Sequence, residues 1–222
     1  MAGSAWNRRT ARRATAASIA TRRRGLARRV RAYVGLGANV GDTERTLEAA
    51  VHAIAALPGA RLRGVSRLYA TAPVGVTTQS EFRNAVVAVD VPLGADARTG
   101  ALALLSALKS LERAFGRQQR QRWGPRELDL DLLVFGRSRL SVARPPDARS
   151  ADPAKSGAHL VVPHPEARER LFVLAPLADL APGLVPPGWT ERVATARDRR
   201  RAVEGADAAR PIGRWTGGGW RR

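Results

Sequence analysis

Apolar and polar positions alternate most regularly between residues 128 and 135 of the chain. Alternation with a period of two is typical of a half-buried β-strand, and residues i and i+2 of a strand share a face. The pattern therefore predicts a strand that runs to Phe135 and presents Asp129 and Asp131 side by side. The predicted apolar face of this strand consists of Leu128, Leu130, Leu132 and Val134.

Similar patterns predict helices and strands along the rest of the chain. Apolar residues at helical spacing indicate two helices, the first capped by Asp42 and the second ended by Gly116. A third helix is expected after the Val161–Pro165 segment, with Pro165 near its first turn. The first two predicted helices cover about 42–57 and 97–115, the further strands cover 32–36, 61–71 and 82–91, and a long surface loop is expected over 137–158.

Phe82 and Asn84 share one face of the strand predicted over 82–91. An aromatic ring and a carboxamide side by side suit a flat heterocycle, because the ring can stack and the amide can hydrogen-bond the edge. The alternative interpretation is a core phenylalanine beside a turn asparagine.

Composition restricts the class of protein. The 222 residues suffice for one domain with a substantial core, or for two small ones. The chain has no cysteine, which excludes a disulfide framework and thiolate metal sites, and its three histidines disfavour a zinc cluster. No apolar run approaches the roughly 20 residues of a membrane span, so no membrane association is expected.

The net charge of +19 is concentrated at the two ends of the chain. Residues 1–31 hold ten arginines and no acidic residue, and residues 189–222 hold nine arginines and four acidic residues. We therefore expect a disordered basic extension over 1–31, one domain over 32–188 and a basic tail over 189–222. A cytoplasmic protein is expected, although the composition of 1–31 is also typical of an organelle transit peptide.

The pair Asp129 and Asp131 indicates a metal site. Two neighbouring carboxylates repel each other, and Mg2+ is usually held by one or two carboxylates together with substrate phosphates. The arginines of the preceding turn, Arg122 and Arg126, match phosphate oxygens, and Trp123 offers a stacking face. The alternative is a solvated strand face whose aspartates pair with nearby arginines.

Two other segments admit more than one interpretation. The glycines of Gly35–Gly41 lack the order and the downstream acidic residue of a dinucleotide-binding fingerprint, which argues against that motif. Lys109 and Glu112 lie three positions apart on a helix and suit an ordinary ion pair. The polar, basic segment 117–122 suits either a mobile phosphate lid or a solvated loop.

The segment Arg122–Asp131, Arg-Trp-Gly-Pro-Arg-Glu-Leu-Asp-Leu-Asp, resembles the signature of the 6-hydroxymethyl-7,8-dihydropterin pyrophosphokinase family of folate biosynthesis. Three further segments resemble that family in the same order, and the resemblance covers about Tyr33 to Pro187. These segments are Tyr33–Asp42, Leu68–Gly75 continued to Asn84, and Val162–Pro165 continued through Arg170, Phe172 and Leu177.

The resemblance implies an α+β fold, a ferredoxin-like three-layer α/β/α sandwich with a mainly antiparallel sheet. It implies transfer of pyrophosphate from ATP to the hydroxymethyl group of the dihydropterin, with release of AMP. The implied ligands are ATP, the pterin and two Mg2+ ions. A monomer without specific nucleic-acid partners is expected.

The resemblance also assigns roles to individual residues. The implied catalytic residues are Arg117, Arg126, Asp129 and Asp131, with both aspartates as metal ligands. The implied pterin contacts are Thr71, Ala72, Val74, Phe82, Asn84, Trp123 and Phe172. The implied ATP contacts are Lys109, Glu112, Arg120, Arg122, Trp123, Leu132, His159, Leu160, Val161, His164 and Arg170.

The chain departs from the family pattern at several of these positions. Phe82 stands where tyrosine is common, Lys109 replaces an expected glutamine, and His159 replaces an expected arginine. The second lid arginine is replaced by Gln119, with Arg120 beside it. A basic nucleic-acid-binding protein and a catalytically impaired homologue are the alternative functions. The intact aspartate pair and the lack of a recognisable nucleic-acid-binding motif argue against them.

Overall fold

The computed structural model of the chain describes residues 28–73, 79–116, 126–144 and 158–222. Its strands are β1 (Arg29–Ala38), β2 (Arg61–Val65), β3 (Leu68–Thr71), β4 (Phe82–Pro92), β5 (Asp129–Phe135), β6 (Leu140–Ala143), β7 (Ala158–Val162), β8 (Arg210–Trp215) and β9 (Trp220–Arg221). Its helices are α2 (Thr43–Ala55), α3 (Ala97–Ala114), α4 (Leu171–Leu180) and α5 (Val193–Glu204), with a short 3-10 helix η3 (Ala167–Glu169).

The centre of the fold is a seven-stranded sheet with antiparallel pairing. Its hydrogen-bonded order is β5-β1-β4-β3-β8-β9, and β2 also pairs with β4. A separate two-stranded sheet joins β6 to β7. The chain order is β1-α2-β2-β3-β4-α3-β5, in which β2 and β3 both pair with β4. With β2 and β3 taken together as one strand position, this is the split β-α-β arrangement of ferredoxin-like folds, so the predicted fold class is confirmed.

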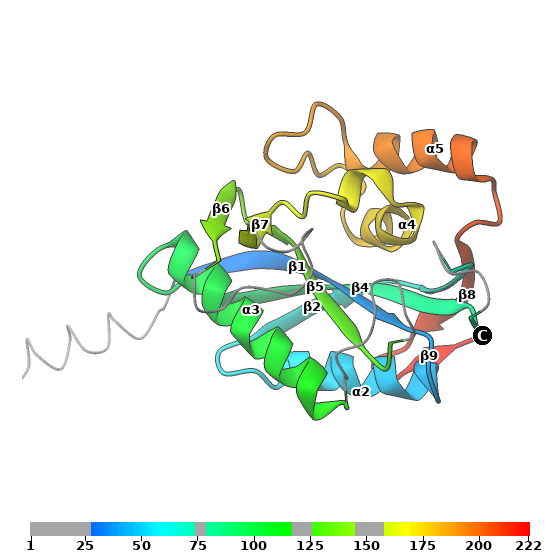
Figure 1. The fold of residues 1–222 in the computed structure, drawn as a ribbon, viewed down its shortest axis with the longest axis horizontal. Coiled ribbons are helices and arrows are strands. Elements are labelled where there is room, and N and C mark those ends of the chain that lie inside the picture. The colour runs from blue at the N-terminus through cyan, green and yellow to red at the C-terminus, as the bar shows by residue number, and fades with distance from the viewer. Residues whose placement is uncertain (1–27, 74–78, 117–125, 145–157) are drawn as a thin grey trace, which may run out of the picture.

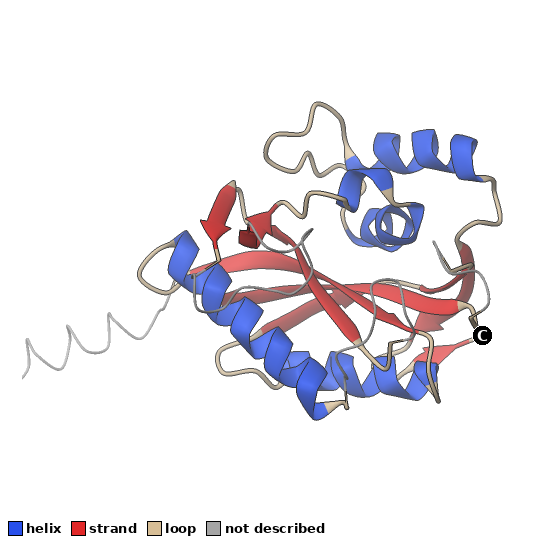
Figure 2. Cartoon of the chain, in the orientation of Figure 1, coloured by secondary structure: helices blue, strands red, loops and turns tan. Residues whose placement is uncertain are grey.

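Helices cover both faces of the sheet and make three layers (Figure 1). Helices α2 and α3 lie on one face and α4 and α5 on the other (Figure 2). The larger core, between the sheet and α2 and α3, includes the fully buried Val34, Leu47 and Leu108. The smaller core, which includes Val86 and Leu174, lies between the sheet and α4 and α5.

The two long predicted helices are present. The side chain of Asp42 accepts a hydrogen bond from the backbone nitrogen of Arg45, so the predicted cap of α2 is confirmed. Helix α3 starts after Asp96, which caps it in the same way. The third helix begins later than expected, because η3 intervenes between Pro165 and the first residue of α4, Leu171.

Strand β5 contains an irregularity that the alternating pattern did not predict. Leu128, Leu130 and Leu132 face the α2–α3 core as expected, but Val134 lies in the core beneath α4. The register between β1 and β5 shifts at this point, since Tyr33 is opposite Val134 and Val34 is opposite Leu132. A bulge of this kind reverses the faces that follow it.

The predicted start of the domain at residue 32 is wrong by a few positions. Strand β1 begins at Arg29, and the carbonyl of Arg28 accepts a hydrogen bond from Leu93. The Arg31 guanidinium forms an ion pair with Asp90. Strand pairing uses backbone groups, so arginines that keep their heads in solvent are compatible with it. Residues 1–27 lie outside the described part of the chain.

Two predicted segments, 61–71 and 137–158, differ from the observed secondary structure. The strand predicted over 61–71 is broken at Ser66 and Arg67 into β2 and β3, which pair with successive parts of β4. The predicted loop 137–158 contains β6 and the start of β7.

The predicted basic tail over 189–222 contains α5, β8 and β9. Its buried apolar side chains include Val193, Ala196 and Trp220. These side chains attach the C-terminal segment to the two cores, so the segment is part of the folded domain.

Candidate active site

Asp129 and Asp131 lie on the same face of β5, as the alternation predicted. The Asp129 side chain is 19% exposed and the Asp131 side chain 41%. Leu128 and Leu130, which alternate with the two aspartates, are fully buried on the opposite face. The apolar face therefore fixes the strand. The two carboxylates lie on the other face, on which α4 also packs, and remain partly exposed.

A buried carboxylate from α3 supports this strand. Glu112 is 2% exposed, and its Oε1 accepts hydrogen bonds from the backbone nitrogen of Leu130 and from Lys109 Nζ, both at 2.7 Å. Lys109 Nζ also donates to the Leu130 carbonyl at 2.9 Å and lies 4.0 Å from Asp131 Oδ1. The predicted Lys109–Glu112 ion pair is confirmed, and it places a cation beside the aspartate pair.

Arg126 and Asn39 form a second support for the carboxylate side. The Arg126 guanidinium donates to Asp129 Oδ2. The backbone nitrogen of Arg126 donates to Asn39 Oδ1 at 2.7 Å, and the Arg126 carbonyl accepts a hydrogen bond from the backbone nitrogen of Asn39 at 3.0 Å. Asn39 is 6% exposed and also donates to Gln79 Oε1 at 2.9 Å. Sequence reasoning assigned no role to Asn39.

The residues assigned to the pterin meet on β3 and β4. Asn84 Nδ2 donates to Thr71 Oγ1 at 2.7 Å, and both residues are buried. Thr71 is the register partner of Phe82, which is half-buried. Ala72 follows Thr71 and is exposed. An aromatic ring, a hydroxyl and a carboxamide thus lie on adjacent strands at one end of the sheet.

Two glycines of β1 separate the residues assigned to the pterin, Asn84 and Thr71 (the pterin side), from Asp129 and Asp131 (the carboxylate side). Gly37 is paired with Asn84 on one neighbouring strand and with Asp129 on the other, and Gly35 is paired with Asp131. A Cβ atom at Gly37 would lie 3.1 Å from Asn84 Oδ1. Asn84 and Asp129 are therefore two strand spacings apart, about 10 Å, with no side chain between them at this level. The glycines at alternate positions, Gly35 and Gly37, are the sequence signal of this arrangement.

His164 and Arg170 approach the same region from the segment before α4. The backbone nitrogen of His164 donates to the Leu133 carbonyl of β5 at 2.9 Å. Burial lowers the pKa of His164, while the nearby Asp131 opposes that shift. The Arg170 guanidinium pairs with Glu166 and lies 5.5 Å from the ring centre of Phe172, the second residue of α4.

The remaining predicted contacts are distributed more widely. Leu132 and Leu160 belong to the α2–α3 core and are 3% and 5% exposed, so their side chains are largely inaccessible to a ligand. His159 is exposed and Val161 is half-buried on β7. Five predicted residues lie outside the described part of the chain, namely Val74, Arg117, Arg120, Arg122 and Trp123.

The chemistry of the described site fits a divalent cation that completes its coordination with substrate oxygens. The described residues contain no group of three or more His, Cys, Asp or Glu side chains arranged to hold a metal. Two carboxylates alone form an incomplete oxygen site. Mg2+ suits such a site, because it retains waters and binds nucleotide phosphates together with one or two carboxylates.

The fold and the site together define a ferredoxin-like α+β enzyme with paired carboxylates and basic side chains at one end of its sheet. Residues 33–182 match the family described as 7,8-dihydro-6-hydroxymethylpterin-pyrophosphokinase (HPPK), and the chain belongs to this family. The resemblance seen in the sequence is thereby confirmed, as is the enzyme class of pyrophosphokinase. The alternative of a nucleic-acid-binding protein is not supported.

Named relatives agree with this assignment. The chain is 42% identical over 167 residues to the 2-amino-4-hydroxy-6-hydroxymethyldihydropteridine pyrophosphokinase of Methylorubrum extorquens, covering 75% of this chain and 92% of the relative. It is 41% identical over 157 residues to the enzyme of the same name from Pseudomonas aeruginosa, covering 71% of this chain and 84% of the relative.

Solved structures support the fold. The crystal structure of wild-type Plasmodium falciparum HPPK-DHPS with pteroate superposes with a TM-score of 0.60 at 13% identity. The superposition covers 84% of this chain and 46% of that chain. This chain thus corresponds to about half of the Plasmodium protein. In the part of the chain that the structure describes, no helix is long and apolar enough to span a membrane.

Proposed function

We propose that the protein transfers pyrophosphate from ATP to the hydroxymethyl group of 6-hydroxymethyl-7,8-dihydropterin, giving AMP and the pterin diphosphate. The observation that carries this proposal is the joint placement of the Asp129–Asp131 pair and the Asn84–Thr71 pair on either side of Gly37. A phosphate-binding side and a heterocycle-binding side are thus separated by about two strand spacings.

The pterin side provides recognition. Asn84 offers both an acceptor and donors to a heterocycle edge, and its bond to Thr71 fixes the orientation of the carboxamide. Phe82 and Phe172 supply aromatic surface for stacking. Val74 and Trp123 complete this list as sequence-based assignments.

The carboxylate side provides the phosphate and metal contacts. Asp129 and Asp131 would hold two Mg2+ ions, which supply charge neutralisation to the triphosphate when bound. Arg126, held through its backbone by Asn39, and Lys109, held by Glu112, place positive charge next to the aspartates. Positive groups fixed before the substrate arrives stabilise developing negative charge without reorganisation.

The reaction needs no side-chain nucleophile, because the pterin hydroxyl itself attacks the β-phosphorus. The bond from this phosphorus to the oxygen that it shares with the α-phosphate breaks, the electron pair leaves with AMP, and the hydroxyl proton is released. Catalysis of this kind rests mainly on positioning and on electrostatic stabilisation. Arg117, Arg120 and Arg122 are proposed as further phosphate contacts from the sequence alone. A monomer is the proposed active form.

The purified protein with ATP, Mg2+ and the hydroxymethyl dihydropterin tests the proposal. AMP and pterin diphosphate should appear in equal amounts, and neither should appear when the pterin is left out. Accumulation of ADP would show that a single phosphoryl group is transferred and would refute the pyrophosphoryl assignment. Asp131→Ala serves as the variant that should lose the reaction while it remains folded.

A further inference from the structure

The C-terminal hairpin, defined as Arg210–Arg222 with β8 and β9, extends the central sheet beyond the part of the chain that matches the family. The family match ends at residue 182. Strand β8 pairs with β3 through Leu68 opposite Gly213 and Tyr69 opposite Pro211. The other neighbour of β3 is β4. The hairpin therefore covers what would otherwise be an open edge of a four-residue strand.

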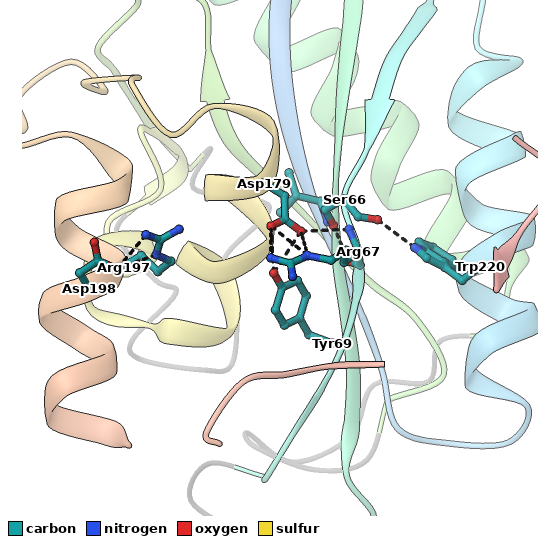
Figure 3. Close-up of polar contacts among 8 residues, drawn as sticks. Ser66, Arg67, Tyr69, Asp179, Arg197, Asp198 and Trp220 are labelled. Atoms are coloured by element: carbon teal, nitrogen blue, oxygen red, sulfur yellow. Dashed lines mark hydrogen bonds and ion pairs between the residues drawn. The ribbon is translucent and has the colours of Figure 1, made fainter. Parts of the chain in front are cut away.

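Trp220 anchors this hairpin at the start of β3. Its side chain is buried, and its indole Nε1 donates to the Ser66 carbonyl at 2.9 Å (Figure 3). Ser66 lies in the break between β2 and β3, and its Oγ accepts a hydrogen bond from the backbone nitrogen of Val86. The backbone nitrogen of Trp220 donates to Glu48 Oε1 of α2 at 2.9 Å. The anchor thus joins the hairpin to the sheet and to α2.

Aromatic and backbone contacts hold the hairpin in place around Trp220. The Trp215 and Trp220 rings meet edge to face with their centres 4.8 Å apart. His52 Nε2 of α2 lies 3.1 Å from the Gly218 carbonyl, which gives the turn between β8 and β9 a second contact with this helix. Arg210 contacts Glu81, the residue before Phe82, at 3.3 Å.

Helix α4 holds the same part of β3 from the opposite face of the sheet. Asp179 accepts hydrogen bonds from Arg67 Nη2 at 2.6 Å and from the Tyr69 hydroxyl at 3.0 Å (Figure 3). Burial and the neighbouring Asp179 carboxylate raise the pKa of Tyr69, so its hydroxyl remains a donor. Residues 66–69 are consequently held by Trp220 on one face and by Asp179 on the other.

We propose that the C-terminal hairpin is a positioning element for the pterin-binding side, with Trp220 as its positioning residue. Strand β3 ends two residues after Tyr69 at Thr71, whose hydroxyl accepts the Asn84 hydrogen bond. Holding β3 against β4 sets the distance between Thr71 and Asn84. The carboxylate side does not depend on this strand, because β5 lies at the other edge of the sheet. This inference rests on the proposed function.

Trp220→Phe in the full-length protein tests the proposal. The variant keeps an aromatic ring but loses the Nε1 donor. Its KM for the pterin should rise about fivefold, the scale of one lost hydrogen bond, while kcat and the KM for ATP stay close to those of the unaltered protein. Trp189→Phe is the matched control, since this tryptophan packs beneath α4 and α5 and should leave both KM values unchanged.

Glu48 provides an independent second variant that leaves Trp220 itself intact. Glu48→Ala removes the acceptor of the Trp220 backbone nitrogen and should also raise the pterin KM, whereas Glu48→Gln keeps an acceptor and should restore it. Equal increases in both KM values, or an unchanged pterin KM in Trp220→Phe and Glu48→Ala, would overturn the proposal.

Hydrogen exchange separates failure of this inference from failure of the proposed function. If the unaltered protein forms no AMP, the proposed function is wrong. Amide exchange measured without substrates then decides the positioning role. Trp220→Phe should accelerate exchange in residues 66–71 and leave β5 unaffected. Unchanged exchange in residues 66–71 would refute the positioning role even in an active enzyme.

Discussion

The two sides of the site are supported by different parts of the molecule. On the carboxylate side, β5 is fixed by the buried Glu112 of α3 and by Asn39 at the end of β1, all within the family match. On the pterin side, Thr71 depends on β3, a strand of four residues whose outer edge pairs with β8. That outer support lies beyond the family match.

Under the proposed function, this difference would combine a reaction centre supported by the main core with a separately supported substrate pocket. The carboxylate side is connected to the main core through contacts among β1, α3 and β5, of which the Asn39–Arg126 bond spans 87 residues. The pterin side is connected through pairing between segments about 140 residues apart. Substitutions on the two sides should therefore affect different kinetic constants: kcat on the carboxylate side and the KM for the pterin on the pterin side.

The largest effect is expected from Asp131→Ala or Asp129→Ala on the carboxylate side. Each substitution should lower kcat on the order of 10^2 or more, the scale for losing one preorganised electrostatic element. The fold should persist, because the buried leucines of β5 are unchanged. Steady-state assays across a Mg2+ series measure the effect, with Asp198→Ala on the exposed face of α5 as the control. Near-normal turnover at limiting Mg2+ would make the pair a solvated strand face.

Asn84→Ala should have a smaller and more selective effect on the pterin side. Loss of the carboxamide leaves a heterocycle edge and the Thr71 hydroxyl without their partner, which costs about 1–3 kcal/mol. Calorimetry should therefore show much weaker pterin binding and nearly unchanged ATP binding. Thr71→Ser keeps the hydroxyl and is the matched control. An equal loss for both ligands would contradict the separation of the two sides.

Much of this comparison could be predicted from the sequence, because it depends on local patterns. The face shared by Asp129 and Asp131 follows from their spacing of two, and the Lys109–Glu112 pair follows from helical geometry. Asp42 caps α2 as its position before an amphipathic segment suggests. Each of these features is fixed by residues within a few positions of one another.

The features that escaped prediction depend on contacts between distant positions. Asn39 acts through Arg126, 87 residues away, and Trp220 bonds Ser66 across 154 residues. Strand β8 has the sequence Arg-Pro-Ile-Gly-Arg-Trp, in which no clean alternation marks a strand. Edge pairing uses backbone groups that nearly every residue type supplies. The bulge that moves Val134 to the other core likewise leaves no trace in the apolar pattern.

A substitution that belongs to neither side sharpens the comparison. Asp90 on β4 pairs with Arg31 of β1 and Arg63 of β2, and the hydrogen bond from Arg31 lowers the pKa of Asp90 below its ordinary value near 3.8. A lowered folded-state pKa stabilises the protein above the unfolded value, and this stability is lost as the pH falls through the folded value. Both arginines are more than a third exposed, so Asp90→Asn should cost only about 1 kcal/mol near neutral pH.

Urea unfolding between pH 7 and pH 2 measures this effect. The difference between Asp90→Asn and the unaltered protein should shrink below pH 4 as the carboxylate becomes protonated in both states. The two KM values should remain unchanged at pH 7, in contrast to Asn84→Ala. A stability difference that is independent of pH would show that the ion pairs of Asp90 are not its source.

The smallest effect is expected from removal of residues 1–27. The shortened chain begins at Arg28, because the Arg28 carbonyl accepts the Leu93 hydrogen bond and β1 starts at the next residue. Every residue assigned to either side of the site lies downstream, so kcat and both KM values should match those of the full chain. The removed segment carries seven arginines and no acidic residue. RNA affinity at low salt should therefore fall on truncation, together with its salt dependence, as counterion release requires. Loss of turnover by a shortened protein that still unfolds cooperatively would place the segment within the enzyme and contradict a domain boundary at Arg28.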